Sequence, residues 1–339
     1  MNKHYNYILA LMLVLLPLGC EAKKEHLIQG RTMGTTYHVK IVTGYFQGIT
    51  GLKDKIEKRL GEINQSMSTY IKDSEISRFN DLGQAGVKFK ITDDFFQVMQ
   101  MGKKVYQLSE GAWDATVNPL VNLWGFGRAG RKTKVPQKQE IAALLPAIGF
   151  GHIEVLESGF LIKKRASITL DFSSIAKGYG VDAVAELIHK EGFQNYLVEI
   201  GGEVFASGLR KDGAPWRVGI NRPQKDAAIS DVYKVVRLRN KALATSGDYR
   251  NFFEVNGIRY CHVIDPKTGY PVSNGVVSVS ILAETCTFAD GLATAIMVMG
   301  HKKGLDLINR LNHVEGLIVV EKPDGSALDF YSKGFEAEN

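Results

Sequence analysis

The chain has 339 residues, of which 45% are hydrophobic and 23% charged, so it is long enough to bury an ordinary globular core. One large domain and two intertwined halves both fit this length. The formal net charge is +6, with basic and acidic residues interspersed. No basic and aromatic stripe or recognised motif accompanies the charge, so we expect no nucleic-acid partner, and the excess mildly favours an anionic ligand.

The N-terminus is typical of a secretory signal. Lys3 precedes an apolar run over residues 8–16, and so short a run cannot span a bilayer core of about 30 Å as a helix. Gly19-Cys20 then resembles the bacterial lipobox, in which the cysteine is lipidated and becomes the new N-terminus. Pro17 stands where that pattern usually has leucine. A cleaved signal with an incidental cysteine is the alternative.

We therefore expect three parts: a lipoprotein signal peptide over residues 1–19, a lipidated tether over 20–28, and a single domain over 29–335. The mature domain is expected outside the cytoplasm, held at a membrane surface. In an oxidising compartment Cys261 and Cys286 could form a disulfide, but two buried free thiols fit the sequence equally well.

Hydrophobic periodicity predicts the elements of the N-terminal part. Residues 26–43 alternate polar and apolar, which indicates a half-buried strand. Apolar spacings of three and four predict an amphipathic helix over 52–67, and Thr92 is expected to cap a helix that runs to about Leu108. Residues 118–135 read as a loop because they contain Gly, Pro and basic residues, and a short helix is expected near 137–148.

The middle of the chain is expected to form a hairpin with strands at 153–155 and 160–170, which turns at Ser158-Gly159. A helix from Ser174 to about Lys190 and a strand over 196–200 follow.

The C-terminal block repeats this order, with a helix through Asp290, another over 305–311 and a strand over 316–320. The repetition predicts two related halves. The fold class is therefore α+β, with helices packed on largely antiparallel sheets.

Asp290 and Thr294 are four residues apart in the run predicted as a helix, so their oxygens leave the same face about one turn apart. A carboxylate and a hydroxyl so placed suit a hard cation such as Mg²⁺, which prefers oxygen ligands and tends to bind on phosphates. The pair predicts that the protein handles a phosphate compound.

The segment 171–180 lies where a strand is expected to end and a helix to begin. Backbone N–H groups at a helix start attract phosphate. Lys177 in the first turn is unfavourable against the helix dipole unless it faces an anion. Asp171 and Ser174 taken singly could be helix caps, but together with Lys177 and the glycines they favour a ligand.

His262 is expected on a strand that enters an Asp-Pro turn. A lone strand histidine is more often structural, but this one titrates in the useful range and could act as a general base. Asp265 is expected to be a turn former before Pro266.

Several other residues are ambiguous. Gly201-Gly202 permits close approach of a flat ligand, although a plain strand end is equally compatible. Trp113 and Tyr70 could sandwich a ring, although isolated aromatics are more often core residues. The sequence has no dinucleotide-binding glycine motif, no P-loop and no Cys/His metal array, which argues against a Rossmann dehydrogenase, a P-loop NTPase and a zinc enzyme.

Taken together, these segments resemble the ApbE family, the FAD:protein FMN transferases. The likeness extends over nearly the whole mature chain in family order, and it is the ordered set of motifs that is specific. The matching stretches are residues 30–35, 68–70, 73–80, 111–127, 171–182, 200–202, 246–249, 262–269 and 289–300.

The resemblance implies that FAD binds in a cleft between the two halves, with Mg²⁺ at its pyrophosphate. It implies metal ligation by Asp290 and Thr294 through their side chains and by Ser174 chiefly through its backbone carbonyl, and it places the proposed base at His262. The residues implied to contact FAD are Met33, Tyr70, Ala112, Trp113, Asp114, Asp171, Lys177 and Ile264.

Two positions depart from the family pattern. Ala293 stands where some relatives have a further acidic neighbour of the metal, so the metal would have fewer ligands. Glu203 follows Gly201-Gly202 where Asp or Asn is commoner, so the contact expected there is in doubt.

The function implied by the resemblance is Mg²⁺-dependent transfer of FMN from FAD to a Thr or Ser hydroxyl of an acceptor protein, with release of AMP. The alternatives are an FAD pyrophosphatase that yields FMN and AMP, and a flavin-binding lipoprotein without turnover. The resemblance suggests flavoprotein subunits of membrane respiratory complexes as acceptors. Family habit places the lipid anchor, on Cys20, in the inner membrane with the domain on the periplasmic side.

Overall fold

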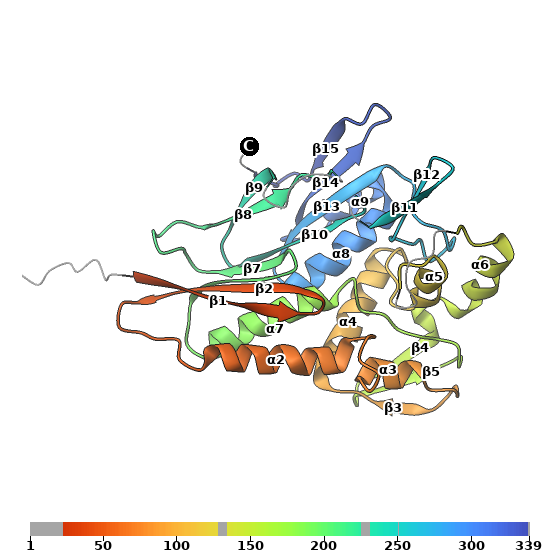
Figure 1. The fold of residues 1–339 in the computed structure, drawn as a ribbon, viewed down its shortest axis with the longest axis horizontal. Coiled ribbons are helices and arrows are strands. Elements are labelled where there is room, and N and C mark those ends of the chain that lie inside the picture. Colours follow the sequence, from red (N-terminus) through yellow and green to blue (C-terminus); the bar gives the residue numbers. More distant parts are fainter. Residues whose placement is uncertain (1–22, 128–133, 225–230, 250, 338–339) are drawn as a thin grey trace, which may run out of the picture.

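The centre of the fold is an eight-stranded sheet. The computed structural model describes residues 23–127, 134–224, 231–249 and 251–337 (Figure 1). All neighbouring strands of the sheet pair antiparallel. In spatial order, which is also chain order, the strands are β1 (Lys23–Thr32), β2 (Thr35–Gly44), β6 (Asn195–Ile200), β7 (Glu203–Ser207), β10 (Lys241–Gly247), β13 (Val276–Ala283), β14 (Glu315–Glu321) and β15 (Ala327–Tyr331).

The sheet uses one arrangement twice. β1 and β2 are followed by helices and then by the hairpin β6–β7, and β10 and β13 are followed by helices and then by the hairpin β14–β15. The helix before the hairpin is α7 (Ala176–Lys190) in the first half, and α8 (Cys286–Met299) with α9 (His301–Ile308) in the second. The α+β class with antiparallel sheets, predicted from the sequence, is confirmed.

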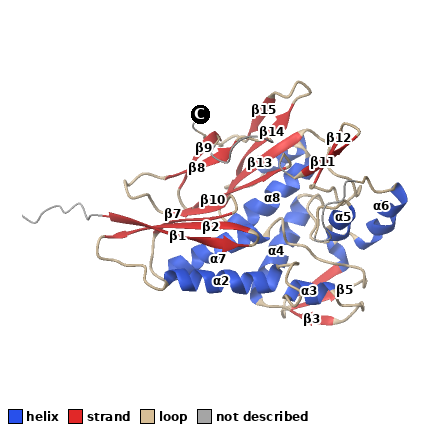
Figure 2. Ribbon diagram, viewed as in Figure 1, coloured by secondary structure: helices blue, strands red, loops and turns tan. Residues whose placement is uncertain are grey.

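The long helices lie on one face of this sheet (Figure 2). α7 contacts β6 and α8 contacts β10 and β13, while α2 (Leu52–Met67) and α4 (Asp93–Leu108) form an outer layer against α7 and α8. The main hydrophobic core lies between the sheet and these helices. Within the described ranges, no helix has both the length and the apolar character that crossing a bilayer requires.

A smaller core lies on the opposite face. The hairpin of β8 (Trp216–Asn221) and β9 (Val232–Leu238) packs there against side chains of β7, β10 and β14. Because both faces are covered, every residue of β13 is buried. The remaining elements surround one end of the molecule: β3 (Lys88–Lys90), β4 (Ile153–Leu156) and β5 (Phe160–Lys163) as a small sheet, the hairpin β11 (Phe252–Val255) and β12 (Ile258–Cys261), and the helices α3 (Glu75–Asn80), α5 (Asn118–Leu123) and α6 (Lys138–Leu144).

The N-terminal strand prediction was wrong in one respect, because residues 26–43 form two strands. Met33 and Gly34 have φ angles of 50° and 75° and make a two-residue hairpin turn between β1 and β2. Residues 23–28, predicted as a tether, belong to β1, where Lys23 pairs with Gly44. Residues 1–22, with the predicted signal peptide and lipobox, lie outside the described residues.

The loop predicted over 118–135 was also partly wrong, because its first six residues form α5. Pro119 favoured the loop interpretation, but it occupies the first turn of the helix, where the missing N–H is not needed. Residues 128–133 of that segment are outside the described part. β5 ends at Lys163 rather than Leu170, and α7 begins at Ala176.

The helices predicted over 52–67 and from Thr92 to Leu108 are confirmed as α2 and α4. The hydroxyl of Thr92 accepts a hydrogen bond from the N–H of Phe95, as expected of the cap.

Helices α7 and α8 approach most closely at Gly178. A Cβ at this position would lie 2.4 Å from the carbonyl oxygen of Cys286 and 2.8 Å from Cβ of Asp290. We expect Gly178→Ala to lower the free energy of unfolding by about 1–3 kcal/mol, because two packed helices must separate. Chemical denaturation measures this change.

Gly61 in α2 provides the matched control, since nothing lies within 4 Å of the Cβ it would gain. Gly61→Ala should raise the free energy of unfolding by about 0.5–1 kcal/mol, the helix-propensity gain alone. A Gly178→Ala protein as stable as the Gly61→Ala protein would contradict the close approach of α7 and α8.

Candidate active site

A cavity of about 650 Å³ lies at the junction of the two halves of the sheet. This volume is typical of a site for a small molecule or cofactor. Glu203 of β7 and Thr245 to Gly247 of β10 come from the two strands that meet there. Helix α7 supplies Lys177, and α8 supplies Asp290, Thr294 and Val298. The other walls come from Asn251 and from residues within 69–81, 112–127, 169–174 and 262–266.

The predicted site residues converge on this cavity with one exception. Those that line it are Tyr70, Ala112, Trp113, Asp114, Asp171, Ser174, Lys177, His262, Ile264, Asp290 and Thr294. Met33 does not line it, because it lies in the β1–β2 turn, and its side chain approaches Gly180 on α7. The individual roles of these residues stay predictions.

Helix α8 presents Asp290 and Thr294 to the cavity on one face. The first residues of α8 are held by Asp182 of α7, which accepts hydrogen bonds from the N–H groups of Cys286 and Thr287, both at 2.8 Å. Asp290 is buried, and its Oδ2 accepts from the N–H of Gly178 at 2.9 Å. This bond leaves Oδ1 for another partner. The two contacts fix Asp290 relative to the start of α7.

Thr294 stands one turn further along α8. Its Oγ1 lies 3.0 Å from the hydroxyl oxygen of Ser246 near the end of β10. The hydroxyl of Thr294 therefore faces the junction of the two halves, on the same side of α8 as the carboxylate of Asp290.

Lys177 and Glu203 form an ion pair in the floor of the cavity, with Nζ 2.5 Å from Oε1. Glu203 is only 2% exposed, and among the described residues its Oε2 has no hydrogen-bond partner. Burial, which outweighs the charge of Lys177, raises the pKa of Glu203 to about 8. Burial also raises the pKa of Asp290. Burial alone would lower the pKa of Lys177, but the carboxylates of Glu203 and Asp290 overcome it and raise that pKa.

This cluster has the chemistry of a cation site. Two buried carboxylates, Glu203 and Asp290, share the single ammonium group of Lys177, so the fully ionised cluster has an excess negative charge. A hard divalent cation favours carboxylate, hydroxyl and carbonyl oxygens, and these are what Asp290, Thr294 and Ser174 offer. In the part of the chain that the structure describes, no group of three or more His, Cys, Asp or Glu could hold a metal. Water or oxygens of a phosphate ligand would complete the coordination of a cation at this place.

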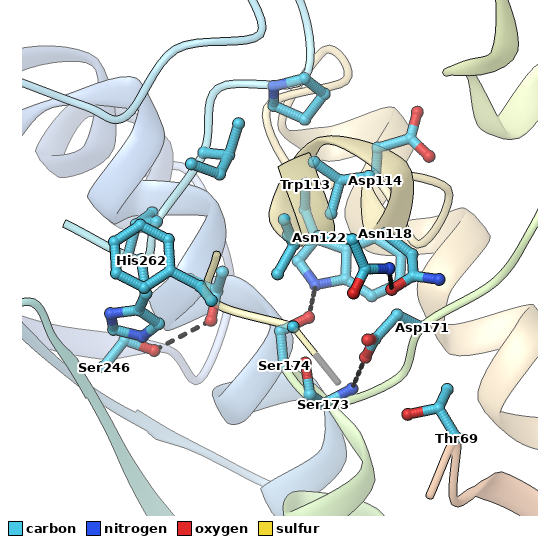
Figure 3. Close-up of a pocket in the computed structure, with 18 of the residues that line it drawn as sticks. Thr69, Trp113, Asp114, Asn118, Asn122, Asp171, Ser173, Ser174, Ser246 and His262 are labelled. Carbon is cyan, nitrogen blue, oxygen red and sulfur yellow. Dashed lines mark hydrogen bonds between the residues drawn. The ribbon is translucent and has the colours of Figure 1, made fainter. Parts of the chain in front are cut away.

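The ring of Trp113 is packed in the core beside the cavity. It therefore does not form, with Tyr70, the two sides of a stack around a ligand ring that the sequence allowed. Its side chain is only 2% exposed, and its ring lies beside Phe150 in the core. Its Nε1–H donates to the hydroxyl of Ser174 at 2.9 Å, which positions Ser174 two residues before the start of α7 (Figure 3). Tyr70, by contrast, is 70% exposed.

Two aspartates organise the loops of the cavity wall. Asp114 is buried and accepts from the N–H and hydroxyl of Thr116 through Oδ1 and from the N–H of Phe150 through Oδ2. Burial raises the pKa of Asp114. The Oδ1 of Asp171 accepts from the N–H of Ser173 at 2.7 Å, which shapes the turn that leads into α7.

His262 is oriented by the backbone. Its Nδ1 lies 3.2 Å from the carbonyl oxygen of Asn251, which makes Nδ1 the donor and leaves Nε2 without the proton. Burial lowers the pKa of His262, so the imidazole is neutral near pH 7. Asp265, predicted as a turn former, accepts from the N–H of Lys267 and the hydroxyl of Thr268, and this prediction is confirmed.

The sequence reasoning missed two amides on α5. Asn118 and Asn122 line the cavity, and their side chains are joined by a 3.0 Å hydrogen bond. Their spacing of four residues is a helical signal, but the glycine, proline and basic residues of 118–135 predict a loop instead. The cysteine alternatives are also resolved, since Cys261 and Cys286 are both buried and free.

The pKa of Glu203 predicts how stability depends on pH. Because the pKa is raised from 4.5 to about 8 in the folded protein, the associated stability is present below pH 4.5 and is lost as the pH rises to 8. We expect Glu203→Gln to flatten the fall in unfolding free energy over this window by up to about 1.4 kcal/mol per pH unit. Urea denaturation at intervals from pH 5 to 8 tests this, and parallel curves for the two proteins would contradict it.

Comparisons with known proteins agree with this architecture. The ApbE family model matches residues 33–318. An FAD:protein FMN transferase of Vibrio cholerae is 43% identical over 323 residues, which cover 94% of this chain and 95% of the relative. One from Haemophilus influenzae is 40% identical over 325 residues, with 94% of each chain covered.

Solved structures give the same result. The flavin transferase ApbE from Vibrio cholerae matches with a TM-score of 0.84 at 40% identity, and the match covers 92% of this chain and 98% of that one. The apo form of Pseudomonas stutzeri flavinyl transferase ApbE matches with a TM-score of 0.82 at 39% identity, over 92% and 95% of the two chains. The resemblance noted in the sequence is confirmed, and the chain belongs to the ApbE family.

Proposed function

We propose that this chain, a flavin transferase of the ApbE family, moves FMN from FAD to a Thr or Ser hydroxyl of an acceptor protein. The hydroxyl oxygen attacks the phosphorus of the FMN part, and the bond from that phosphorus to the bridging oxygen breaks. AMP then leaves with that oxygen. The observation that supports this reaction is the meeting of Lys177, His262 and two buried carboxylates in one cavity of cofactor size.

The residues fit the metal that such a reaction uses. Mg²⁺ would be held by the side chains of Asp290 and Thr294 and by the backbone carbonyl of Ser174, and when bound it offsets charge on the pyrophosphate and the leaving AMP. Burial raises the pKa of Asp290 and so opposes its ionised form, and a cation at this place would offset that cost.

The protein groups have separate tasks in this proposal. Lys177, fixed by Glu203, supplies positive charge for the phosphates. The Nε2 of His262 accepts the proton of the acceptor hydroxyl, and the carbonyl of Asn251 keeps the imidazole in the tautomer required for this. The amides of Asn118 and Asn122 and the side chain of Tyr70 face the remainder of the cavity, where the nucleotide would lie.

We further propose that Cys20 is lipidated and that the domain works on the periplasmic side of the inner membrane. The support is the short apolar run before Gly19-Cys20, which is too short to span a bilayer. Acceptors in this location would be flavoprotein subunits of membrane respiratory complexes.

Mass spectrometry of a co-expressed candidate acceptor tests the transfer. The expected result is one added FMN on a Thr or Ser, together with AMP in the reaction mixture. AMP and free FMN that form at the same rate without an acceptor would instead show an FAD pyrophosphatase. A chain that retains FAD unchanged when Mg²⁺ and acceptor are supplied would overturn the proposal.

A further inference from the structure

We propose that the loop after β2 touches the membrane surface through Tyr45 and Phe46. Phe46, at 97%, is the most exposed large hydrophobic side chain among the described residues, and the adjacent Tyr45 is 63% exposed. Their rings pack edge to face, 5.2 Å apart, and so form a single aromatic knob. Water is a poor environment for such a pair, whereas the interface of a bilayer accommodates aromatic rings.

The position of this knob in the fold indicates that its partner is a lipid bilayer. Lys23, the first described residue, pairs with Gly44 at the outer end of the β1–β2 hairpin. The knob directly follows Gly44 in the sequence. The preceding residues 1–22 include the apolar run and Cys20. Because Lys23 pairs with Gly44, the aromatic pair lies beside the point where the described domain begins, and Figure 1 shows the start of β1 and the end of β2 at the same end of the long axis.

The charges around this end suit an anionic lipid surface. Lys23 and Lys24 are exposed at the start of β1. In the hairpin register Lys23 faces Gly44 and Lys24 faces Thr43, so both lysines lie beside the strand end that precedes the knob. Each cation close to an anionic leaflet favours binding.

This contact would orient the enzyme. Two elements beside the cavity, α5 and the hairpin β11–β12, lie at the opposite end of the long axis from the start of the N-terminal strand (Figure 1). With the knob on the bilayer, the cavity faces away from the lipid, toward an acceptor segment that projects from the membrane. The proposed contact is independent of the chemistry proposed for the cavity.

A fluorescent label at position 46 tests the proposal. The full chain with Phe46→Cys is labelled with a polarity-sensitive fluorophore and reconstituted in phosphatidylglycerol and phosphatidylethanolamine vesicles. The expected result is a blue-shifted emission, quenched by lipids that have bromine on their acyl chains. The unsubstituted chain, treated alike, gives the background from the native thiols, which include Cys261 and Cys286.

Ile258 provides the matched control, because it is an exposed apolar residue (57%) on β12 at the other end of the molecule. Its labelled Ile258→Cys variant should show no shift. Absence of the shift at position 46, or an equal shift at both positions, would overturn the proposal. An equal shift at position 46 in neutral phosphatidylcholine vesicles would overturn the part assigned to the lysines.

A second measurement separates this proposal from the function of the cavity. The Tyr45→Ser/Phe46→Ser protein should transfer FMN to a soluble acceptor at the unchanged rate, because neither residue lines the cavity. With Lys23→Glu and Lys24→Glu, the label at position 46 should lose most of its shift. A shift that persists in this variant would show that a protein-independent adsorption of the dye, rather than the basic end, produced the signal.

Discussion

Replacement of Asp290 by Asn is expected to reduce FMN transfer at least about a hundredfold. Asparagine keeps an oxygen that can accept from the N–H of Gly178 at the observed 2.9 Å, so α7 and α8 should remain packed. What it removes is the negative charge that would hold Mg²⁺, and metal stabilisation of a transferring phosphoryl group is worth several kcal/mol. Because each 1.4 kcal/mol corresponds to a factor of ten in rate, a hundredfold loss requires only part of that.

Steady-state rates over a range of Mg²⁺ concentrations provide the measurement. The Asp290→Asn protein should need a higher Mg²⁺ concentration for half-maximal rate, whereas a mutation that only perturbs folding would lower the rate without this shift. Asp306→Asn on α9, an exposed carboxylate outside the cavity, is the control and should behave as the natural protein. Equal Mg²⁺ dependence of all three proteins would remove Asp290 from the metal site.

Replacement of His262 by Gln is expected to slow transfer by about 10²–10⁴-fold, the usual contribution of a general base. The pH profile gives a sharper test. His262 must be neutral to accept a proton, and burial lowers its pKa below 6.5. The value of kcat/KM should therefore be level near neutral pH and fall only below pH 6.5, as the imidazole becomes protonated.

In the His262→Gln protein this acidic fall should disappear, because no imidazole titrates. His301, which stacks on Phe330 away from the cavity, serves as the control, and His301→Gln should retain both the rate and the acidic limb. An acidic limb that persists unchanged in His262→Gln would assign the base to another group.

The pairing of β1 with β2 is encoded in the sequence, because the alternation of buried and exposed residues changes phase between the two strands. Buried positions are even in β1, such as Ile28, and odd in β2, such as Tyr37 and Val39. In the hairpin register Ile28 faces Val39, so a turn must lie where the alternation changes phase. Met33-Gly34 lies at that point. The alternation of Tyr37, Val39 and Ile41, all in β2, predicts a strand but does not by itself reveal the turn before it.

Helical spacing was a more reliable guide at the site. The four-residue interval between Asp290 and Thr294 correctly predicted a shared face of one helix, because helix geometry is local. The ion pair of Lys177 with Glu203 was beyond such reasoning, because it depends on how α7 packs against the end of β7. No local sequence pattern indicates that Lys177 and Glu203 lie within contact distance.

The walls of the cavity come from segments spread from residue 69 to residue 298. No contiguous fragment contains the whole set, so the proposed nucleotide could bind only when the entire domain has assembled. Occupancy and cooperative folding are therefore thermodynamically linked: a nucleotide at a hundred times its dissociation constant would raise the free energy of unfolding by about 2.7 kcal/mol. A bound substrate would thus protect remote parts of the molecule, including strands that it never touches.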